Sequence, residues 1–356
     1  MRSRNNGGVI GAYQLPNKNY ANGVFFIHDA AIYNTGSNPI WPLASSLLYT
    51  VSTTGSVTIA TANNNGNMKT ATFTSNGTFT VNNGSGVLEV LLVGGGGPGG
   101  WANNSNYSGY ASAGGGGGGG GVVLLSTWVN PGTTFTVEVG STSTSTTLIQ
   151  GYPSKISSTT GLNYTVLGGG YGGGVWGIGG SAGGSGGSGG GGGAYYSTSN
   201  VIQAYGTTGA GVGGTDFMNN GGSAASAYVS SDAGGGGGAG TVGYNSTYSS
   251  NTALASAGGD GYLWPRTGYY YGAGGGGGRT DSLGGSDYAS LGGLSGTGIR
   301  TYGTGGVNTP SQSAYAKAGQ NGYGQGGGGT SQAYPDTALP PGGGGSGTVI
   351  FCWRYQ

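Results

Sequence analysis

The side chains that most often carry enzyme chemistry are scarce in this chain. His28 is its single histidine and Cys352 its single cysteine. We therefore expect no Ser-His-Asp triad, no Cys-His site and no multi-histidine metal site within one chain. Cys352 has no partner for an internal disulfide, and its apolar neighbours predict a buried small hydrophobic residue. His28 beside Asp29 is typical of a local turn or a satisfied polar pair.

The acidic residues form no recognisable catalytic or metal-binding pattern. Among the nine acidic residues, five aspartates lie near glycine-rich turns: Asp216, Asp232, Asp260, Asp281 and Asp287. No loop has the carboxylate spacing of a Ca²⁺ site, although a bound Ca²⁺ stays open. A carboxylate pair for glycoside cleavage depends on separation in space, so the sequence leaves it open as well. The glycine runs lack the Lys-Ser/Thr of a phosphate loop. We predict no enzyme and no cofactor.

Tyrosines are the side chains best suited to binding. They cluster between glycine tracts among Ser, Asn, Gly and Thr, the mixture that antibody loops use because tyrosine gives a large amphipathic contact area at low entropic cost. The alternative is that these aromatic residues cap the ends of a glycine bundle. Residues 262–271 are the strongest single candidate for a binding tip. The candidate receptor-binding residues are Trp101, Tyr107, Tyr110, Tyr195, Tyr196, Tyr262, Trp264, Arg266, Tyr269, Tyr270 and Tyr271.

The composition limits the kinds of partner and the way the chain can fold. Glycine supplies 92 of 356 residues and charged residues only 5%, against a usual charged share of about 25%. Aromatic residues make up 11%, which argues against a disordered linker. The net charge of +1, with scattered Lys and Arg, gives no footprint for nucleic acid. Apolar runs such as 87–93 are too short to insert into a membrane. The basic N-terminus precedes no apolar region, so no signal peptide is expected.

The glycine tracts predict an unusual regular structure. A polyglycine-II helix is left-handed, has three residues per turn and makes no internal hydrogen bonds. Without side chains, such helices can lie close together and satisfy their backbones laterally, which offsets the entropy that glycine loses. Residues 114–121 would be an interior helix, and 182–190, with its non-glycine residues three apart, an edge helix. The alternative is a set of flexible linkers. The tracts are 94–100, 114–121, 168–174, 183–193, 234–240, 274–278, 326–329 and 342–345.

Several segments predict β-strands around these tracts. Residues 71–74 and 78–81 flank Ser-Asn-Gly and predict a hairpin. Residues 86–93 predict a buried strand, 131–140 an alternating strand after a Pro-Gly turn, and 347–355 a closing strand. We expect these strands to form one small sheet. The only helical turn expected lies near residues 28–33.

The fold class expected is therefore mainly β and irregular: a small antiparallel β-sheet framework, a packed bundle of polyglycine-II helices and little α-helix. The expected regions are 1–48, a β-rich framework with the first glycine tracts at 49–167, the bundle with tyrosine-rich loops at 168–346, and the closing strand at 347–356.

The chain resembles glycine-rich tail-fibre and tip adhesins of bacteriophages. Residues 73–81 running into 90–97 are similar to the opening of those proteins, and 131–140 continues their pattern. The ending, Gly-Gly-Ser-Gly at 344–347 followed by Thr-Val-Ile and then Arg-Tyr at 354–355, is also similar. The front is similar to virion proteins of marine and cyanobacterial phages, on residues 7–11, 21–25 and 41–42.

The resemblance implies a non-enzymatic virion structural protein with a polyglycine-II bundle whose connecting loops contact a host receptor. It implies a surface glycan or an outer-membrane protein as the partner, and attachment to other virion proteins through residues 1–48. A homotrimeric base at 1–48 and a single chain both stay open. The chain has no tail-fibre shaft repeat. The alternatives are a capsid fibre or decoration protein and a cellular glycine-rich surface filament protein.

Overall fold

The computed structural model describes residues 49–63, 67–103, 111–144, 149–176, 179–197, 200–205, 217–222, 224–227, 230–246, 256–281, 290–305, 307–309, 312–333 and 340–355. Over these residues the protein is built from short strands in mostly antiparallel sheets and contains no helix. No helix in this part of the chain could span a membrane. The helical turn expected near residues 28–33 lies outside the described residues, as does the whole segment 1–48.

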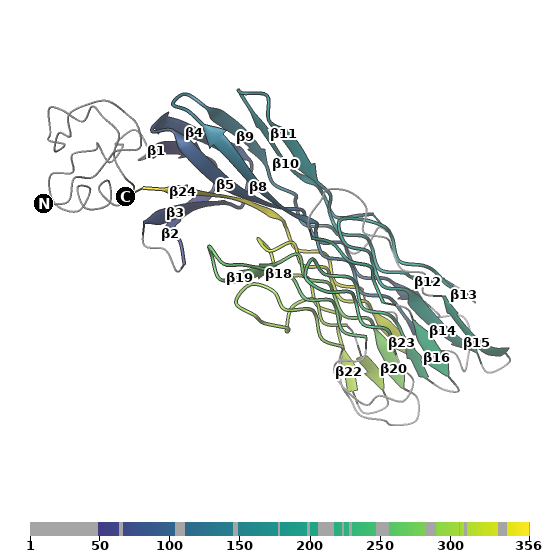
Figure 1. Cartoon of the computed structure of the whole chain (residues 1–356). Coiled ribbons are helices and arrows are strands. Elements are labelled where there is room, and N and C mark those ends of the chain that lie inside the picture. The colour runs from purple at the N-terminus through teal and green to yellow at the C-terminus, as the bar shows by residue number, and fades with distance from the viewer. Residues whose placement is uncertain are drawn as a thin grey trace, which may run out of the picture.

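Two five-stranded antiparallel sheets form a β-sandwich at one end of the molecule (Figure 1). The first sheet has the order β1 (Thr50–Thr54), β4 (Gly77–Asn83), β9 (Thr134–Glu138), β10 (Ser154–Ser158) and β11 (Asn163–Val166). The second has the order β2 (Val57–Thr61), β3 (Met68–Phe73), β24 (Thr348–Arg354), β5 (Gly86–Val93) and β8 (Val122–Val129). The buried strand predicted at 86–93, the strand after Pro131-Gly132 and the closing strand are confirmed as β5, β9 and β24.

The sandwich holds the main hydrophobic core. Aromatic side chains from both sheets meet there, and the rings of Phe79 and Phe351 stack with centroids 4.3 Å apart. Phe73, Phe135 and Trp353 pack around them and are at most 2% exposed. Alternation along each strand puts these residues on the inward faces, as expected for two sheets packed face to face.

The hairpin predicted at residues 71–81 is wrong. β3 pairs with β2 and β24, whereas β4 pairs with β1 and β9, so the turn between them crosses from one sheet to the other. A tight two-residue hairpin turn needs positive φ at Asn76 and Gly77, and neither residue has it. The reason is packing, because Phe73 and Phe79 both face the sandwich core from opposite sheets. The prediction that these strands form one sheet is also wrong, because they form two.

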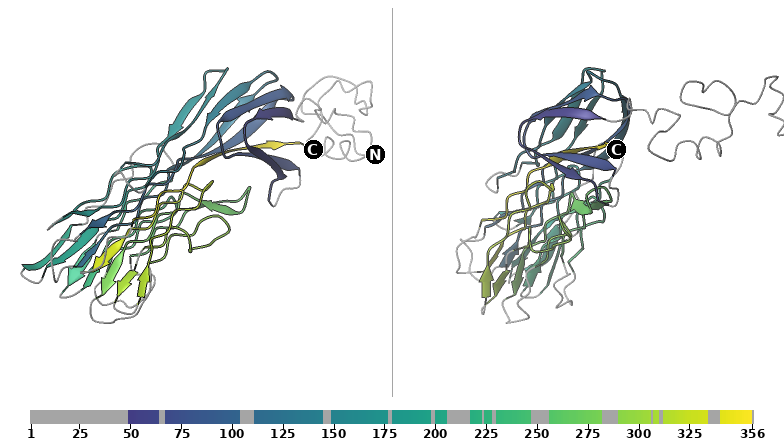
Figure 2. Two further views of the ribbon diagram at one scale, coloured as in Figure 1. Left: turned by 180° about the vertical axis from the view of Figure 1, so that it is seen from behind. Right: turned by 90° about the vertical axis from the view of Figure 1, so that its left-hand side faces the viewer.

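Four strands of the sandwich continue directly into glycine tracts. β5 leads into 94–100 and β11 into 168–174, while 114–121 leads into β8 and 342–347 into β24. These tracts run side by side away from the sandwich (Figures 1 and 2). The tracts expected within 49–167 therefore belong to the same bundle as the later ones.

The tract 114–121 donates hydrogen bonds with a period of three residues. The N–H groups of Gly114, Gly117 and Gly120 donate to carbonyls of 324–330, spaced by three. Those of residues 115, 118 and 121 donate to 167–173, and those of 116 and 119 to 234–237, at distances of 2.8 to 3.0 Å throughout. Successive N–H groups along the tract therefore donate in turn to three different neighbouring segments.

The carbonyl groups of the same tract bind three further segments. Those of residues 114 and 117 accept from 275–278, those of 115, 118 and 121 from 94–100, and those of 116 and 119 from 188–191. The tract thus lies at the centre of six hydrogen-bonded neighbours. In this way the buried N–H and C=O groups of a segment that is neither helix nor strand find hydrogen-bond partners.

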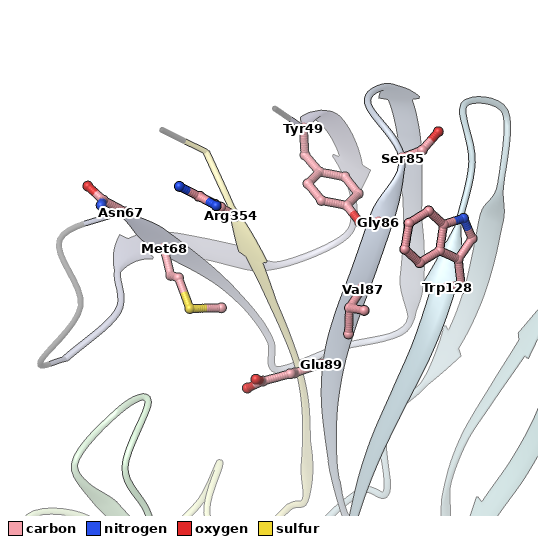
Figure 3. Close-up of a pocket in the computed structure, with 9 residues that line it drawn as sticks. All are labelled: Tyr49, Asn67, Met68, Ser85, Gly86, Val87, Glu89, Trp128 and Arg354. Carbon is pink, nitrogen blue, oxygen red and sulfur yellow. The ribbon is translucent and has the colours of Figure 1, made fainter. Parts of the chain in front are cut away.

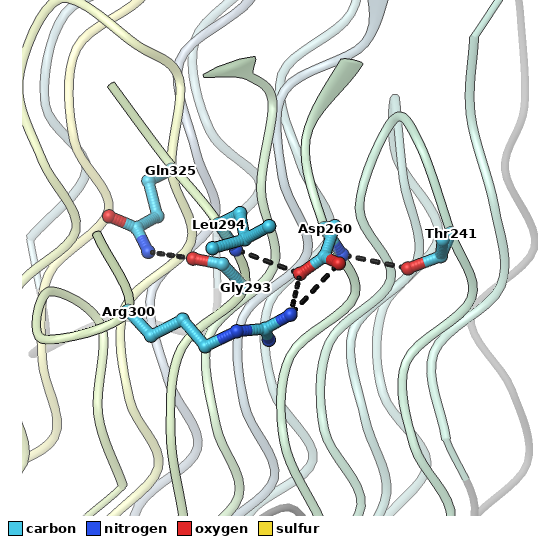
Figure 4. A network of polar contacts seen from close by, with 6 residues as sticks. All are labelled: Thr241, Asp260, Gly293, Leu294, Arg300 and Gln325. Carbon is cyan, nitrogen blue, oxygen red and sulfur yellow. Dashed lines mark hydrogen bonds and ion pairs between the residues drawn. The ribbon is translucent and has the colours of Figure 1, made fainter. Parts of the chain in front are cut away.

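The glycine bundle also includes segments that the sequence analysis did not predict. Polar side chains connect these segments at the edge of the bundle (Figure 4). The Asp260 carboxylate accepts from the backbone N–H of Leu294 at 2.9 Å and from the Arg300 guanidinium at 2.8 Å. The Asp260 N–H donates to Thr241 Oγ1 at 2.8 Å. Three segments that are far apart in the sequence are joined at one aspartate.

The segment 182–190, predicted to be an edge helix, shows the expected hydrogen-bond period only in its first part. The N–H groups of residues 181, 184 and 187 donate to carbonyls of 174, 171 and 168, with the expected period of three. Ser185 is exposed, as an edge position requires. The chain then reverses, and Ser188 is fully buried.

The end of the molecule away from the sandwich, called the distal end below, consists of short strands at the ends of the tracts (Figure 1). One sheet has the order β13 (Gly179–Gly180), β12 (Val175–Trp176) and β6 (Ala102–Asn103). The next has β15 (Asn200–Tyr205), β14 (Gly193–Ser197), β7 (Ala111–Ala113) and β23 (Ser331–Ala333). The third has β16 (Ala225–Ala227), β17 (Ser230–Asp232), β20 (Arg279–Asp281), β21 (Val307–Thr309) and β22 (Gln312–Ala314). Small buried residues such as Ala113, Ala194 and Ala233 pack between these sheets.

Candidate functional site

The aromatic residues predicted to bind fall in two places. Trp101 directly precedes β6, and Tyr195 and Tyr196 lie in β14, so all three belong to the distal end. Tyr195 is only 4% exposed and packs inside it. Tyr107 and Tyr110 lie outside the described residues.

The second group forms a hairpin beside the sandwich, far from the distal end. β18 (Tyr262–Trp264) pairs antiparallel with β19 (Tyr269–Tyr271), and the hairpin covers part of the outer face of the second sheet (Figure 1). The N–H of Asn63, next to β2, donates to the carbonyl of Arg266 in the hairpin turn at 2.6 Å. Residues 262–271 are therefore a fixed part of the fold rather than a distal tip.

Several of the predicted residues in this hairpin are structural. Trp264 and Tyr271 are each 2% exposed and pack against Leu91, Ile350 and Cys352 of the second sheet; we call this set the hairpin cluster. Tyr262 stacks on Phe217 with ring centroids 3.8 Å apart. Tyr270 is partly buried, and its backbone pairs with Gly296. Of the hairpin tyrosines, Tyr269 offers the most surface, at 38% exposed.

The hairpin forms one wall of a cavity of about 670 Å³, called the hairpin groove here. The opposite wall is the outer face of β2 and β3, and the turn at residues 321–323 closes a third side. Gly272 N–H donates to the Tyr323 carbonyl at 2.7 Å and so ties that turn to the hairpin. The lining residues are Thr58, Ala60, Thr61, Asn63, Thr70, Thr72, Thr74, Arg266, Thr267, Gly268, Tyr269, Tyr271, Asn321, Gly322 and Tyr323.

Threonine hydroxyls line one wall because alternate residues of a strand share a face. Thr58 of β2 lies directly opposite Thr72 of β3, and Ala60 lies opposite Thr70. The hydroxyl groups of Thr58 and Thr72 hydrogen-bond to nothing in the part of the chain that the structure describes. Each is therefore available to a ligand as both donor and acceptor.

Three tyrosines form the opposite side of the hairpin groove. The Tyr323 ring lies 5.5 Å from that of Tyr271, stacked, and 5.9 Å from that of Tyr269, edge to face. The Tyr271 hydroxyl donates to Thr267 Oγ1 at 3.1 Å, which fixes its ring. Burial raises the pKa of both Tyr271 and Tyr323 above the ordinary value, so both phenols stay neutral.

The charge of the groove is neutralised at its edge. Arg266 Nε and Nη2 donate to the two carboxylate oxygens of Glu89 at 2.8 and 2.6 Å. These hydrogen bonds raise the pKa of the Arg266 guanidinium above its ordinary value. Such a bidentate pair holds the guanidinium in place, and no carboxylate occurs among the described residues that line the groove.

Glu89 also borders a second cavity on the same sheet face, of about 480 Å³ (Figure 3). Val87 and Trp128 lie opposite each other on β5 and β8 and are 53% and 61% exposed. Tyr49 and Arg354, near the two ends of the described chain, lie on its rim. Burial raises the pKa of Tyr49 to about 12.

Three side chains that could do chemistry, Asp232, Asp260 and Cys352, are paired or buried within the fold. No group of three or more metal-ligating side chains occurs among the described residues. Asp232 and Asp260 pair with Arg279 and Arg300. Cys352 is fully buried in the hairpin cluster, as predicted, and burial raises the pKa of its thiol to about 12. Its sulfur therefore stays protonated and inaccessible.

No family model matches the chain, and no curated protein matches it significantly.

Three residues of the predicted receptor-binding set, Arg266, Tyr269 and Tyr271, line the hairpin groove. The threonine wall was missed because residues 71–74 were assigned to a hairpin with 78–81. The alternation of Thr70, Thr72 and Thr74 was the available signal. Nothing in the sequence around Tyr323 indicates that it lies beside Tyr269.

Proposed function

We propose that the chain is a non-enzymatic structural protein of a bacteriophage particle, a tail-fibre or tip adhesin that recognises the host surface. The observation that carries the proposal is the separation of the sandwich from the distal strands by a hydrogen-bonded glycine bundle. Such an arrangement suits a protein that holds recognition loops away from its point of attachment. The resemblance of residues 70–356 to phage tail adhesins supports the same function.

In this proposal the glycine tracts are polyglycine-II helices. The three-residue hydrogen-bond period of 114–121 matches three residues per turn, and the backbone hydrogen bonds of this tract all go to other segments. No glycine of 114–121 has a positive φ. Pro98 fits within its tract because proline fixes φ near the value of this helix. Its carbonyl still accepts from Gly172 at 2.9 Å.

Recognition in this proposal belongs to the segments that join the distal strands. They start and end at strands with fixed positions, such as β6 and β7, so their sequences can vary without altering the bundle. The segment 104–110, with Tyr107 and Tyr110 among Asn, Ser and Gly, has a composition suited to adaptable binding. The partner is a host surface glycan or outer-membrane protein. Residues 1–48 attach the chain to other virion proteins, and the chain acts there either as a homotrimer or as a single chain.

A cell-binding assay tests recognition. We expect the fluorescently labelled full chain to bind host cells, and the double variant Tyr107→Ser/Tyr110→Ser to bind at least about tenfold more weakly, as when aromatic anchors of an interface are lost. Tyr164→Ser is the matched control, because Tyr164 is an exposed tyrosine on β11 of the sandwich. Equal binding of the two variants, with unchanged melting temperatures, would contradict recognition by the distal segments.

Immunogold labelling of phage particles with an antibody against residues 194–271 tests position. Label at the tail or fibre tip is the expected result. Label over the head would overturn the adhesin in favour of a capsid fibre or decoration protein, and label on cells but on no particle would overturn a virion protein altogether.

A further inference from the structure

We infer that the hairpin groove is a binding site for a neutral oligosaccharide. This site goes beyond the proposed function, because it lies beside the sandwich and not at the distal end. Glycan binding there does not depend on which particle, or which part of a particle, carries the protein.

The size of the groove suits a small ligand rather than a protein surface. Its volume of about 670 Å³ lies within the usual range for small-molecule sites, about 300 to 1,000 Å³. Its three walls come from β2 and β3, the β18–β19 hairpin and the turn at 321–323. Backbone hydrogen bonds from Asn63 and Gly272 hold these walls together, so the groove is formed before a ligand arrives.

The polar groups of the groove match sugar hydroxyls. Thr58 and Thr72 present hydroxyls that donate and accept, as sugar hydroxyls also do. Asn321 accepts from Ser346 N–H at 3.1 Å through its Oδ1, which leaves its Nδ2 amide out of that bond. Exposed Thr61 and Asn63 extend the polar row along the same wall. A largely apolar ligand would leave these groups without partners when it buried them.

Tyr269 supplies the aromatic face that a sugar ring needs. It is 38% exposed, and its ring is held edge to face by Tyr323. A tyrosine in this position offers an apolar ring surface together with a polar hydroxyl, which suits a ligand whose one face carries C–H groups and whose rim carries hydroxyls.

The electrostatics favour a neutral ligand. Of the lining residues that the structure describes, only Arg266 is charged, and Glu89 neutralises it through two short hydrogen bonds. An acidic sugar would compete with the Glu89 carboxylate for that guanidinium. Among the described residues that line the groove there is no Asp or Glu, so none of them supplies the carboxylate pair that glycoside cleavage requires.

A peptide is the less suitable occupant. β2 is an edge strand of the second sheet, and a peptide strand would pair with its backbone edge. The groove is instead lined by outward side chains of β2 and β3. Binding of an unrelated extended peptide in place of sugars would thus count against the inference.

Saturation-transfer NMR on the intact chain provides the test. The probes are neutral linear trisaccharides built from glucose, galactose, mannose or N-acetylglucosamine, with a sialylated trisaccharide and an eight-residue peptide for comparison. We expect at least one neutral trisaccharide to bind. Tyr269→Ala and the double variant Thr58→Val/Thr72→Val should each weaken it about fivefold or more, the loss expected when a stacking surface or buried hydrogen bonds are removed.

Tyr164→Ala is the control, since Tyr164 is similarly exposed but lies outside the groove. Valine keeps the shape of threonine, so these variants should fold, and equal melting temperatures would show it. The inference is overturned if no neutral trisaccharide binds, if the sialylated sugar or the peptide binds better, or if the groove variants bind like Tyr164→Ala. Failure here leaves the cell-binding assay unaffected, because that assay depends on Tyr107 and Tyr110.

Discussion

At the scale of single residues, the ionisable groups of the hairpin cluster make stability depend on pH. Cys352 and Tyr271 are both buried there, and burial raises the pKa of each above its ordinary value. Folding therefore favours the protonated forms. The stabilisation is complete below the pKa of the unfolded thiol, 9.0, and is lost as the pH rises toward the folded value of about 12.

We accordingly expect the urea midpoint of unfolding to stay level between pH 7 and 8 and to fall steadily between pH 9 and 11. The variant Cys352→Val removes the earlier of the two ionisations, so its midpoint should fall less between pH 9 and 10. A midpoint that stays constant up to pH 11 would contradict burial of these groups.

Single residues also show why a surface role cannot be assigned from residue type. Tyr269 and Tyr271 are two positions apart in one strand, yet one is 38% and the other 2% exposed. Trp264 is as buried as Tyr271, whereas its neighbour Leu263 is 44% exposed. Tyr269 and Tyr271 lie on the same face of β19, so their different exposure depends on what each ring meets in the folded protein, which the sequence alone does not tell.

At the scale of elements, the tracts need glycine because their backbones touch. A Cβ on Gly118 would lie 2.2 Å from the carbonyl oxygen of Ser188, and one on Gly116 2.0 Å from that of Gly275. Real Cβ contacts are never this short, and the neighbouring backbones cannot give way without breaking their own hydrogen bonds.

The variant Gly118→Ala should therefore lose about 4 kcal/mol of unfolding free energy, at the high end of single substitutions. Ser185→Ala is the control, because Ser185 is exposed on an edge segment and should change stability by less than about 0.5 kcal/mol. Chemical denaturation of both measures the difference. Equal stabilities would show that the tract around Gly118 is not packed.

The elements that could be predicted from sequence are those with a strong local pattern. β5, β9 and β24 have continuous or alternating apolar residues, and pure glycine leaves few regular structures other than a laterally bonded bundle. The wrong hairpin at 71–81 shows the limit, since turn residues do not tell whether two strands pair or face each other across a core. Edge segments such as 256–261 were missed because they carry side chains and resemble ordinary loops.

At the scale of the whole molecule, the sandwich and the bundle support each other. Strands of both sheets pass directly into glycine tracts, so the order of strands in the sandwich sets which tracts lie side by side. Pairing between segments as distant as 114–121 and 324–330 cannot be deduced from local sequence. The hairpin groove depends on the same long-range arrangement, since its walls come from residues near 60, 270 and 322.

Amide hydrogen exchange of residues 114–121 in the intact protein tests the central claim most directly. All eight N–H groups of this tract donate to other segments, so we predict that they exchange only when the whole protein unfolds, as slowly as the core strands β5 and β24. Exchange within seconds, at the rate of an unstructured glycine chain, would contradict the glycine bundle and with it the proposal that the bundle holds recognition loops away from the sandwich.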